Sequence, residues 1–497
     1  MKQLNPMQQN RSHRLTGGAI LLFSLALSGG VPVPSTHAAA LEELATPLAD
    51  PLLARPPVLE RGKLLPGERA PLTCSVSSGL PRQALSLADA IDLALCRHPQ
   101  VQAAWAAIKL QAAQLGEARA AYLPAINAGI GQVHSKSSPT LESGRLSRTQ
   151  YATLSWRLLD AGARGANHRA ADALLEAAGA SHDAALQKAM ANVISLYFDA
   201  QSSLASRQAR AQSEALARTV LATAVKREQR GVGSRPETLQ ARTFVARAEL
   251  EHARASGLYQ KALVALQAAM GIAADDVPQG LTLAPPDDDD PSELEQDLQD
   301  WLQQVRQQHP AILAAQAQLE ASLEKVRATR AEGLPTVDLN AGRALNGRPD
   351  QPGAGRGARD TTVGISLNIP LFDGFSRTYK VRGAQAQVEL REAELREIQT
   401  QVLGEVASAH VEAGAALRNL ATSRRLLEAA QSSVDAISRK YDSGIADIVE
   451  MLNAQAALSE AGQERIRAQS EWRSARLRLL ANAGRMSRSV AAADARP

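Results

Sequence analysis

Four short segments of the chain alternate apolar and polar residues with a period of two, namely residues 125–133, 150–159, 336–342 and 361–371. The alternation makes Leu158 an apolar position of the second segment, and the apolar positions that are expected to face lipid in the second and fourth segments include Leu154, Trp156, Val363, Ile365 and Leu367. Successive side chains of a β-strand point to opposite faces, so each segment is predicted to be a strand with one apolar face. Lengths near 9–11 residues fit tilted strands that cross a bilayer, with these five side chains facing lipid. An ordinary half-buried sheet of a soluble domain would give the same alternation.

Two much longer segments have helical periodicity and contain no proline, about 164–229 and 376–442. At ~1.5 Å per residue, each predicts a helix of about 100 Å. Apolar residues of the second segment recur at a seven-residue spacing typical of a coiled coil, at Val406, Ala413, Leu420, Leu427, Val434 and Tyr441. Gly231 and Gly233 follow the first segment and Gly444 follows the second. These glycines predict turns that lead into shorter returning helices, and therefore two antiparallel helical hairpins.

The same order of predicted helices and strands occurs twice along the chain. Leu123-Pro124 recurs 211 residues later, as does His98-Pro99, and from Asp160 to Gly271 matching residues lie 213 positions apart. The repeats are predicted over residues 85–285 and 292–490, with a linker at 286–291 and a tail at 491–497. Each repeat begins with an expected helix, 86–121 or 293–332, that ends at the Leu-Pro pair. The Asp run at 287–290 reads as a solvated linker, with calcium binding as the alternative.

The first 40 residues have the features of a secretory signal. Lys2, Arg11 and Arg14 precede the apolar run 19–27, and small residues follow at 38–40. Residues 41–84 are expected to form an N-terminal periplasmic extension. The formal net charge of the whole chain is +4, and removal of the signal leaves 52 basic and 51 acidic residues. The basic excess belongs largely to the signal, which argues against a nucleic-acid partner.

The chain has two cysteines, Cys74 and Cys96. An oxidising compartment favours a disulfide that fastens the extension, and two unpaired thiols are the alternative. The sequence shows no catalytic triad, metal cluster or phosphate loop, so no enzyme activity and no cofactor are expected. His98 and His309 each precede a proline at a helix start, where they are expected to cap or pack.

Four strands cannot close a barrel, and an open edge in lipid leaves backbone groups unsatisfied. The strands must therefore be completed by other copies of the chain. Two copies would supply eight strands and three copies would supply twelve, with a wider lumen. The fold class expected is mainly helical with a transmembrane β-barrel: long antiparallel hairpins form a periplasmic α-barrel, and each subunit contributes four strands.

Three segments are similar to the TolC family of outer-membrane efflux and secretion channels: residues 121–124 (AYLP), 370–374 (PLFDG) and 441–454 (YDSGIADIVEMLNA). The resemblance spans about 85–486. It implies a homotrimer with a twelve-stranded barrel in outer-membrane lipid. It also implies docking with a periplasmic adaptor (membrane fusion) protein and an inner-membrane transporter. The extension with its cysteines looks like the branch that exports large toxins by type I secretion.

In this family the helix turns form the periplasmic entrance, which a tyrosine and acidic groups hold closed. By resemblance, Tyr441 matches the tyrosine and Glu237 an acidic partner. Glu450 and Asn453 occupy two positions that are aspartates in the best-known member, and Ala446 stands where that member has a locking arginine. A solvated helix face is the alternative interpretation of Glu237 and Glu450.

Three functions are compatible with these features. The first is an outer-membrane conduit for type I secretion of a toxin, including haemolysins. The second is a small-molecule efflux channel of the same family. The third, from a different class, is a periplasmic coiled-coil adaptor without a pore, which would explain the signal and hairpins but not the four strands.

Overall fold

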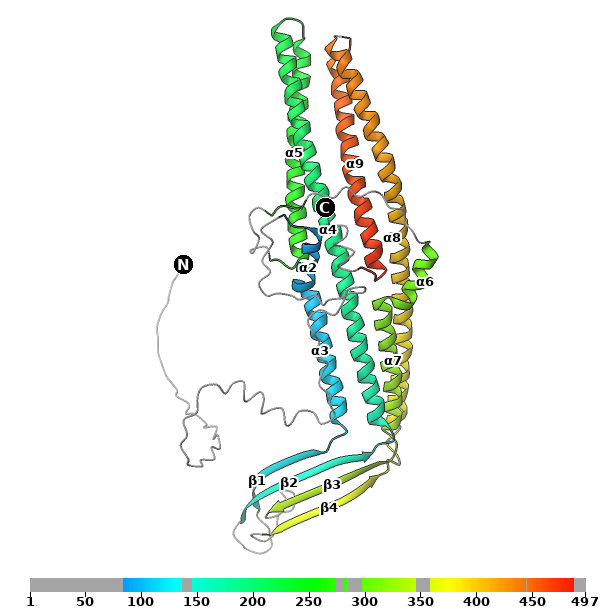
Figure 1. The fold of residues 1–497 in the computed structure, drawn as a ribbon. Coiled ribbons are helices and arrows are strands. Elements are labelled where there is room, and N and C mark those ends of the chain that lie inside the picture. Colours follow the sequence, from blue (N-terminus) through cyan, green and yellow to red (C-terminus); the bar gives the residue numbers. More distant parts are fainter. Residues whose placement is uncertain are drawn as a thin grey trace, which may run out of the picture. The chain divides into compact units, whose positions relative to one another are not determined.

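The computed structural model describes residues 84–135, 145–273, 281–284, 297–345, 358–443 and 445–486. The expected signal (1–40), linker (286–291) and tail (491–497), together with Cys74 and Gly444, lie outside the described residues. The disulfide therefore stays a prediction. Two series of helices and strands follow each other in the same order (Figure 1).

The first series comprises α2 (Leu87–Arg97), α3 (Pro99–Ala120), β1 (Ala125–Ser135), β2 (Arg145–Leu159), α4 (Ala163–Gln229) and α5 (Arg235–Ala269). The second comprises α6 (Leu298–Gln308), α7 (Pro310–Ala331), β3 (Thr336–Leu345), β4 (Arg359–Asn368), α8 (Ser376–Asp442) and α9 (Ile448–Asn482). Corresponding helices have equal lengths, 67 residues in α4 and α8 and 35 residues in α5 and α9. The two long helices and the four strands predicted from the sequence are confirmed, with β4 ending at Asn368 before Pro370.

The expectation of one continuous helix over 86–121 and over 293–332 is wrong. His98 separates α2 from α3 and His309 separates α6 from α7, both with extended backbone. The imidazole Nδ1 of each histidine accepts a hydrogen bond from the backbone N–H two residues on, which caps the next helix at its N-terminal proline. Burial lowers the pKa of His309, which keeps the ring neutral and able to accept this bond. Capping by both histidines is confirmed.

The helices lie side by side in a single layer (Figure 1). α4 contacts α3, α5, α7 and α9, and α8 contacts α6, α7 and α9. The coiled-coil positions predicted on α8 carry the packing, because Val406, Ala413 and Leu420 are buried against Trp472 and Leu479 of α9. A second core joins α2, α4, α5 and the end of α9. Within the described residues, no helix has a stretch long and apolar enough to cross a membrane.

The four strands form one antiparallel sheet in the order β1-β2-β3-β4. β1 and β4 each pair with one described neighbour, so one edge of each strand is open within the chain. β1 follows α3 and β2 leads into α4, while β3 follows α7 and β4 leads into α8. The sheet is thus attached to the helical layer through four short connections, at the ends of α4 and α8 opposite the helical hairpin turns.

Candidate functional site

The strand register places the large apolar side chains on one face of the sheet. Leu154 lies opposite Ile126 on β1 and Ala341 on β3, and Ala341 lies opposite Val363. Trp156, Leu339 and Ile365 form the next row, and Leu159, Val337 and Leu367 the row after it. Val363, Ile365 and Leu367 are 74%, 70% and 61% exposed, so a contiguous apolar face is uncovered in the single chain. Such a face marks a surface that contacts lipid or another protein.

The alternation is interrupted once. A register shift between Arg157 and Leu159 brings Leu159 opposite Val337, although the sequence pattern placed Leu158 on the apolar face. Leu159 is 64% exposed and Leu158 is half-buried. A β-bulge adds one residue to a strand and reverses the faces beyond it, so the assignment of Leu158 is corrected to Leu159.

The opposite face of the sheet is polar. Arg157 forms an ion pair with Asp338, with 2.9 Å between Nε and Oδ1. Asn340 donates a hydrogen bond to the Ser366 hydroxyl across β3 and β4. A sheet with one apolar and one polar face suits a wall between lipid and water.

The junction between β2 and α4 contains a buried ion pair that the sequence did not reveal. Arg164 and Asp160 are 2.9 Å apart between Nε and Oδ2, and their side chains are 14% and 9% exposed. Arg164 also donates to the carbonyls of Arg157 and Leu158 and lies over the Tyr122 ring at 4.9 Å. In the second repeat, Asp373 accepts a hydrogen bond from the backbone N–H of Arg377. The recurrence of Asp160 at Asp373 was the sequence signal, but it did not identify the partner.

The two hairpin turns have related geometry. Gly231 adopts φ 71°, in the left-handed region that glycine favours, and a Cβ at Gly233 would lie 2.9 Å from the Arg227 side chain. Ser234 then caps α5 and Asp447 caps α9, through the backbone N–H groups of Glu237 and Glu450. Both glutamates lie in the first helical turn, where a negative charge is favoured.

The acidic candidates lie at the hairpin turns but are not bonded to one another. Glu450 and Asn453 are exposed and Glu237 is half-buried. In the described part of the chain, the side chains of Glu237, Glu450 and Asn453 make no hydrogen bond or ion pair. Their place at the turns fits either a charged entrance or a solvated helix start.

Tyr441 connects the two hairpins. Its ring is buried with Ala224, Ala241, Ile448 and Leu452 in a small cluster at the hairpin turns. The guanidinium of Arg227, on α4, lies 5.0 Å from the ring centroid, a distance at which a cation–π interaction is favourable. Sequence reasoning singled out Tyr441 and missed Arg227, because periodicity identifies a helix face but not the residue packed against it.

No group of three or more His, Cys, Asp or Glu side chains that could hold a metal ion occurs among the residues described. Two features of the described residues stand out as candidates for function, the amphipathic sheet with its open edges and the polar hairpin turns. The first is an antiparallel β-sheet with an uncovered apolar face, carried on long helices.

Comparison with known proteins gives this architecture a family. A sequence profile described as "Outer membrane efflux protein" matches residues 90–272 and 301–485. Protein CyaE of Bordetella pertussis is 34% identical over 448 residues, covering 89% of this chain and 92% of that protein. The outer membrane protein TolC of Escherichia coli is 25% identical over 173 residues, covering 33% and 35%. The outer membrane channel CmeC of Campylobacter jejuni has a similar fold, with a TM-score of 0.71 at 16% identity, covering 86% of this chain and 96% of that one.

The fold and the profile define a class, the outer-membrane efflux channels. The chain belongs to the outer membrane efflux protein family, also called the TolC family. It is an outer-membrane efflux channel with a large periplasmic helical portion.

Proposed function

We propose that three copies of the chain assemble into a homotrimer, in which twelve strands close a barrel in outer-membrane lipid and the helices form a periplasmic tube. The observation that carries this proposal is the sheet, which exposes a continuous apolar face and two open edges. Open edges in lipid leave backbone groups unsatisfied, so β4 must pair with β1 of the next copy. Four strands per subunit make twelve in a trimer, which is wide enough for a lumen.

The conduit serves type I secretion of a protein toxin, in a tripartite system with a periplasmic adaptor and an inner-membrane transporter. Support comes from the similarity to CyaE, which extends over most of both chains. Small-molecule efflux is the competing function within the family. The alternative from a different class is a periplasmic coiled-coil adaptor without a pore. In such a protein the apolar sheet face would have no lipid to contact.

Deletion of the gene tests which kind of cargo the channel exports. We expect loss of toxin release into the medium with unchanged drug sensitivity, and reintroduction of the gene should restore release. Increased drug sensitivity with normal release would assign small-molecule efflux instead. A soluble periplasmic monomer in cell fractions, without heat-modifiable trimers in the outer membrane, would contradict the channel.

The hairpin turns form the periplasmic entrance of this conduit. Tyr441 and Arg227 join the two hairpins of one subunit, while Glu237, Glu450 and Asn453 line the opening. Three-fold symmetry would place three copies of Glu450 around it. Because these side chains are not neutralised by an ion pair in the described residues, they would attract cations.

Replacing Glu450 by glutamine is expected to reduce the cation preference of the pore. Removal of three negative charges at the opening should lower the cation-to-anion permeability ratio by about threefold in planar bilayers. The matched control is Glu460→Gln, an exposed position further along α9. Equal ratios for both variants would place the selectivity elsewhere.

Replacing Tyr441 by alanine is expected to loosen the entrance. The change removes the ring that Arg227 covers and that packs in the cluster with Ile448 and Leu452. Single-channel conductance should rise, and Tyr441→Phe should raise it less than Tyr441→Ala, because the ring and its cation–π contact remain. Identical conductance in all three proteins would show that this contact does not hold the entrance closed.

A further inference from the structure

The apolar face of the sheet changes character near the two strand-to-strand loops. Arg343 lies on this face, in the row of Ala152 and Thr361. The next row toward the loops contains Arg359, opposite Leu345, and Arg148 follows beyond Gln150 on β2. The period of two along each strand directs these three arginines to the same face as Leu154 and Ile365. All three are exposed.

Among the described strand residues on this face, the charged side chains are all positive. The described strand residues that share it include no aspartate or glutamate, whereas Asp338 and Asp360 occupy positions of the opposite face. Charged side chains on a lipid-facing surface are destabilising near the bilayer midplane and tolerated near the interfaces. The three arginines therefore mark a border of the apolar band rather than its interior.

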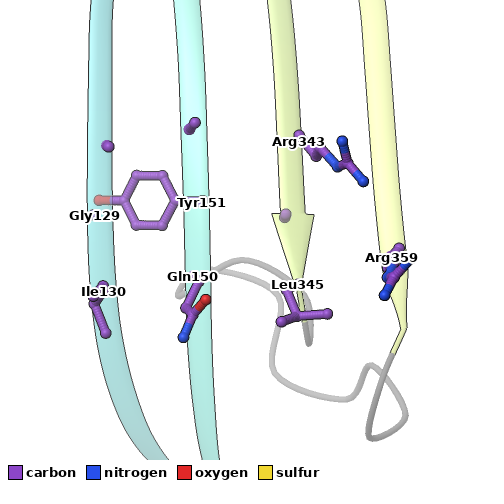
Figure 2. A pocket seen from close by; sticks show the side chains of 10 residues that line it. Gly129, Ile130, Gln150, Tyr151, Arg343, Leu345 and Arg359 are labelled. Carbon is purple, nitrogen blue, oxygen red and sulfur yellow. The ribbon is translucent and has the colours of Figure 1, made fainter. Parts of the chain in front are cut away.

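Two of these arginines, Arg343 and Arg359, also border a hollow in the sheet surface. It has a volume of about 640 Å³, and its lining includes Ile130, Gln150, Leu345, Arg343 and Arg359. Figure 2 shows Arg343 and Arg359 on neighbouring strands with Leu345 beside them. The lining thus combines two guanidinium groups with aliphatic side chains and the side chains of Gln150 and Tyr151, and the guanidinium and aliphatic groups suit a ligand with an anionic head and an apolar body.

The length of β4 corresponds to the thickness of the apolar band of a membrane. Exposed Phe372 and Phe375, whose ring centroids are 5.5 Å apart, follow the strand on the side of the helices. Arg359 and Asn368, the two ends of β4, are nine residues apart, about 30 Å of strand at ~3.3 Å per residue. With a strand tilt of about 35–45°, this is roughly 21–25 Å along the membrane normal, which is close to the height of an apolar band of about 25 Å.

We propose that Arg148, Arg343 and Arg359 form a basic border that binds the phosphate-bearing headgroup of an outer-leaflet lipid, while its acyl chains lie on the apolar rows of Leu154 and Ile365. Because the helices lie in the periplasm, the loop end of the strands faces the outer leaflet. Arginine forks bind phosphate oxygens in a bidentate manner, which favours a phosphorylated headgroup over a neutral one. The inference rests on the proposed barrel.

Binding of lipid A to the purified full-length trimer tests this inference. The probes are diphosphoryl lipid A and its dephosphorylated form, titrated in detergent micelles. The double variant Arg343→Gln/Arg359→Gln should bind the diphosphoryl form about 25-fold more weakly, or about fivefold per arginine. Its affinity for the dephosphorylated form should equal that of the wild type, and inorganic phosphate should not compete.

The control Arg242→Gln/Arg254→Gln makes the same change in charge at exposed positions of α5 and should bind like the wild type. Arg343→Lys/Arg359→Lys keeps the charge and should lose less affinity than the glutamine variant. A heat-modifiable trimer band is recorded for each sample. Equal binding by a trimeric glutamine variant, or competition by inorganic phosphate, would overturn the lipid site and leave the channel intact. Absence of trimers in the wild type would overturn both.

Discussion

Replacing Arg164 by alanine is expected to destabilise the subunit by about 3–5 kcal/mol, because it leaves the buried Asp160 carboxylate without its partner. Asp160 is 7% exposed, so water does not replace the lost ion pair. The same change removes the donors to the Arg157 and Leu158 carbonyls at the end of β2. The strand-to-helix junction should then open, which thermal unfolding of the trimer by circular dichroism would detect as a lower midpoint.

Two further variants distinguish the effect of losing the ion pair from the effect of shortening an arginine side chain. Arg377 is the repeat-related arginine, and it is exposed in the single chain without an ion pair to a described residue. Arg377→Ala should therefore cost about 1 kcal/mol or less. The double variant Asp160→Ala/Arg164→Ala should lose less stability than the two single changes added together, because neither charge is left alone. Simple additivity would show that the pair contributes nothing of its own.

The long elements of this fold could be predicted from the sequence because their periodicity extends over many residues. The seven-residue repeat of α8 identified the buried Val406, Ala413 and Leu420. The break between α2 and α3 was missed because the same apolar periodicity continues across it. The break is caused by local chemistry, because Pro99 cannot donate a backbone hydrogen bond and His98 caps the helix that follows.

The candidate site was only partly predictable. The alternation of the strands gave the correct apolar face for Leu154 and Val363, but a single added residue near Leu159 reversed the pattern. Arg227 contacts Tyr441 across helices that are far apart in the sequence. A single sequence shows which positions face inward, whereas the partner depends on how α4 and α8 are packed. The basic border was missed for a related reason, since it appears only when three strands are placed in register.

The second large effect is expected when a charge is placed on the lipid-facing side of the sheet. Ile365 lies about midway between Arg359 and Phe372, near the predicted bilayer midplane, and is 70% exposed in the single chain. Replacing Ile365 by arginine should cost about 2–4 kcal/mol per subunit, because a charged side chain would face hydrocarbon. Three-fold symmetry applies this cost three times. We expect the variant to yield little or no heat-modifiable trimer in the outer membrane.

The adjacent residue supplies the matched control. Gly364 belongs to the opposite, polar face, and a Cβ placed there has no heavy atom within 4 Å. Gly364→Arg adds the same side chain and the same charge one position away, where it would enter the aqueous lumen. This variant should assemble at a level near that of the wild type and lower the cation preference of the pore. If both variants assembled equally well, the apolar face would not be the lipid-facing one. If Gly364→Arg alone failed to assemble, the two faces would be exchanged, because a one-residue shift moves a side chain from one face of a strand to the other.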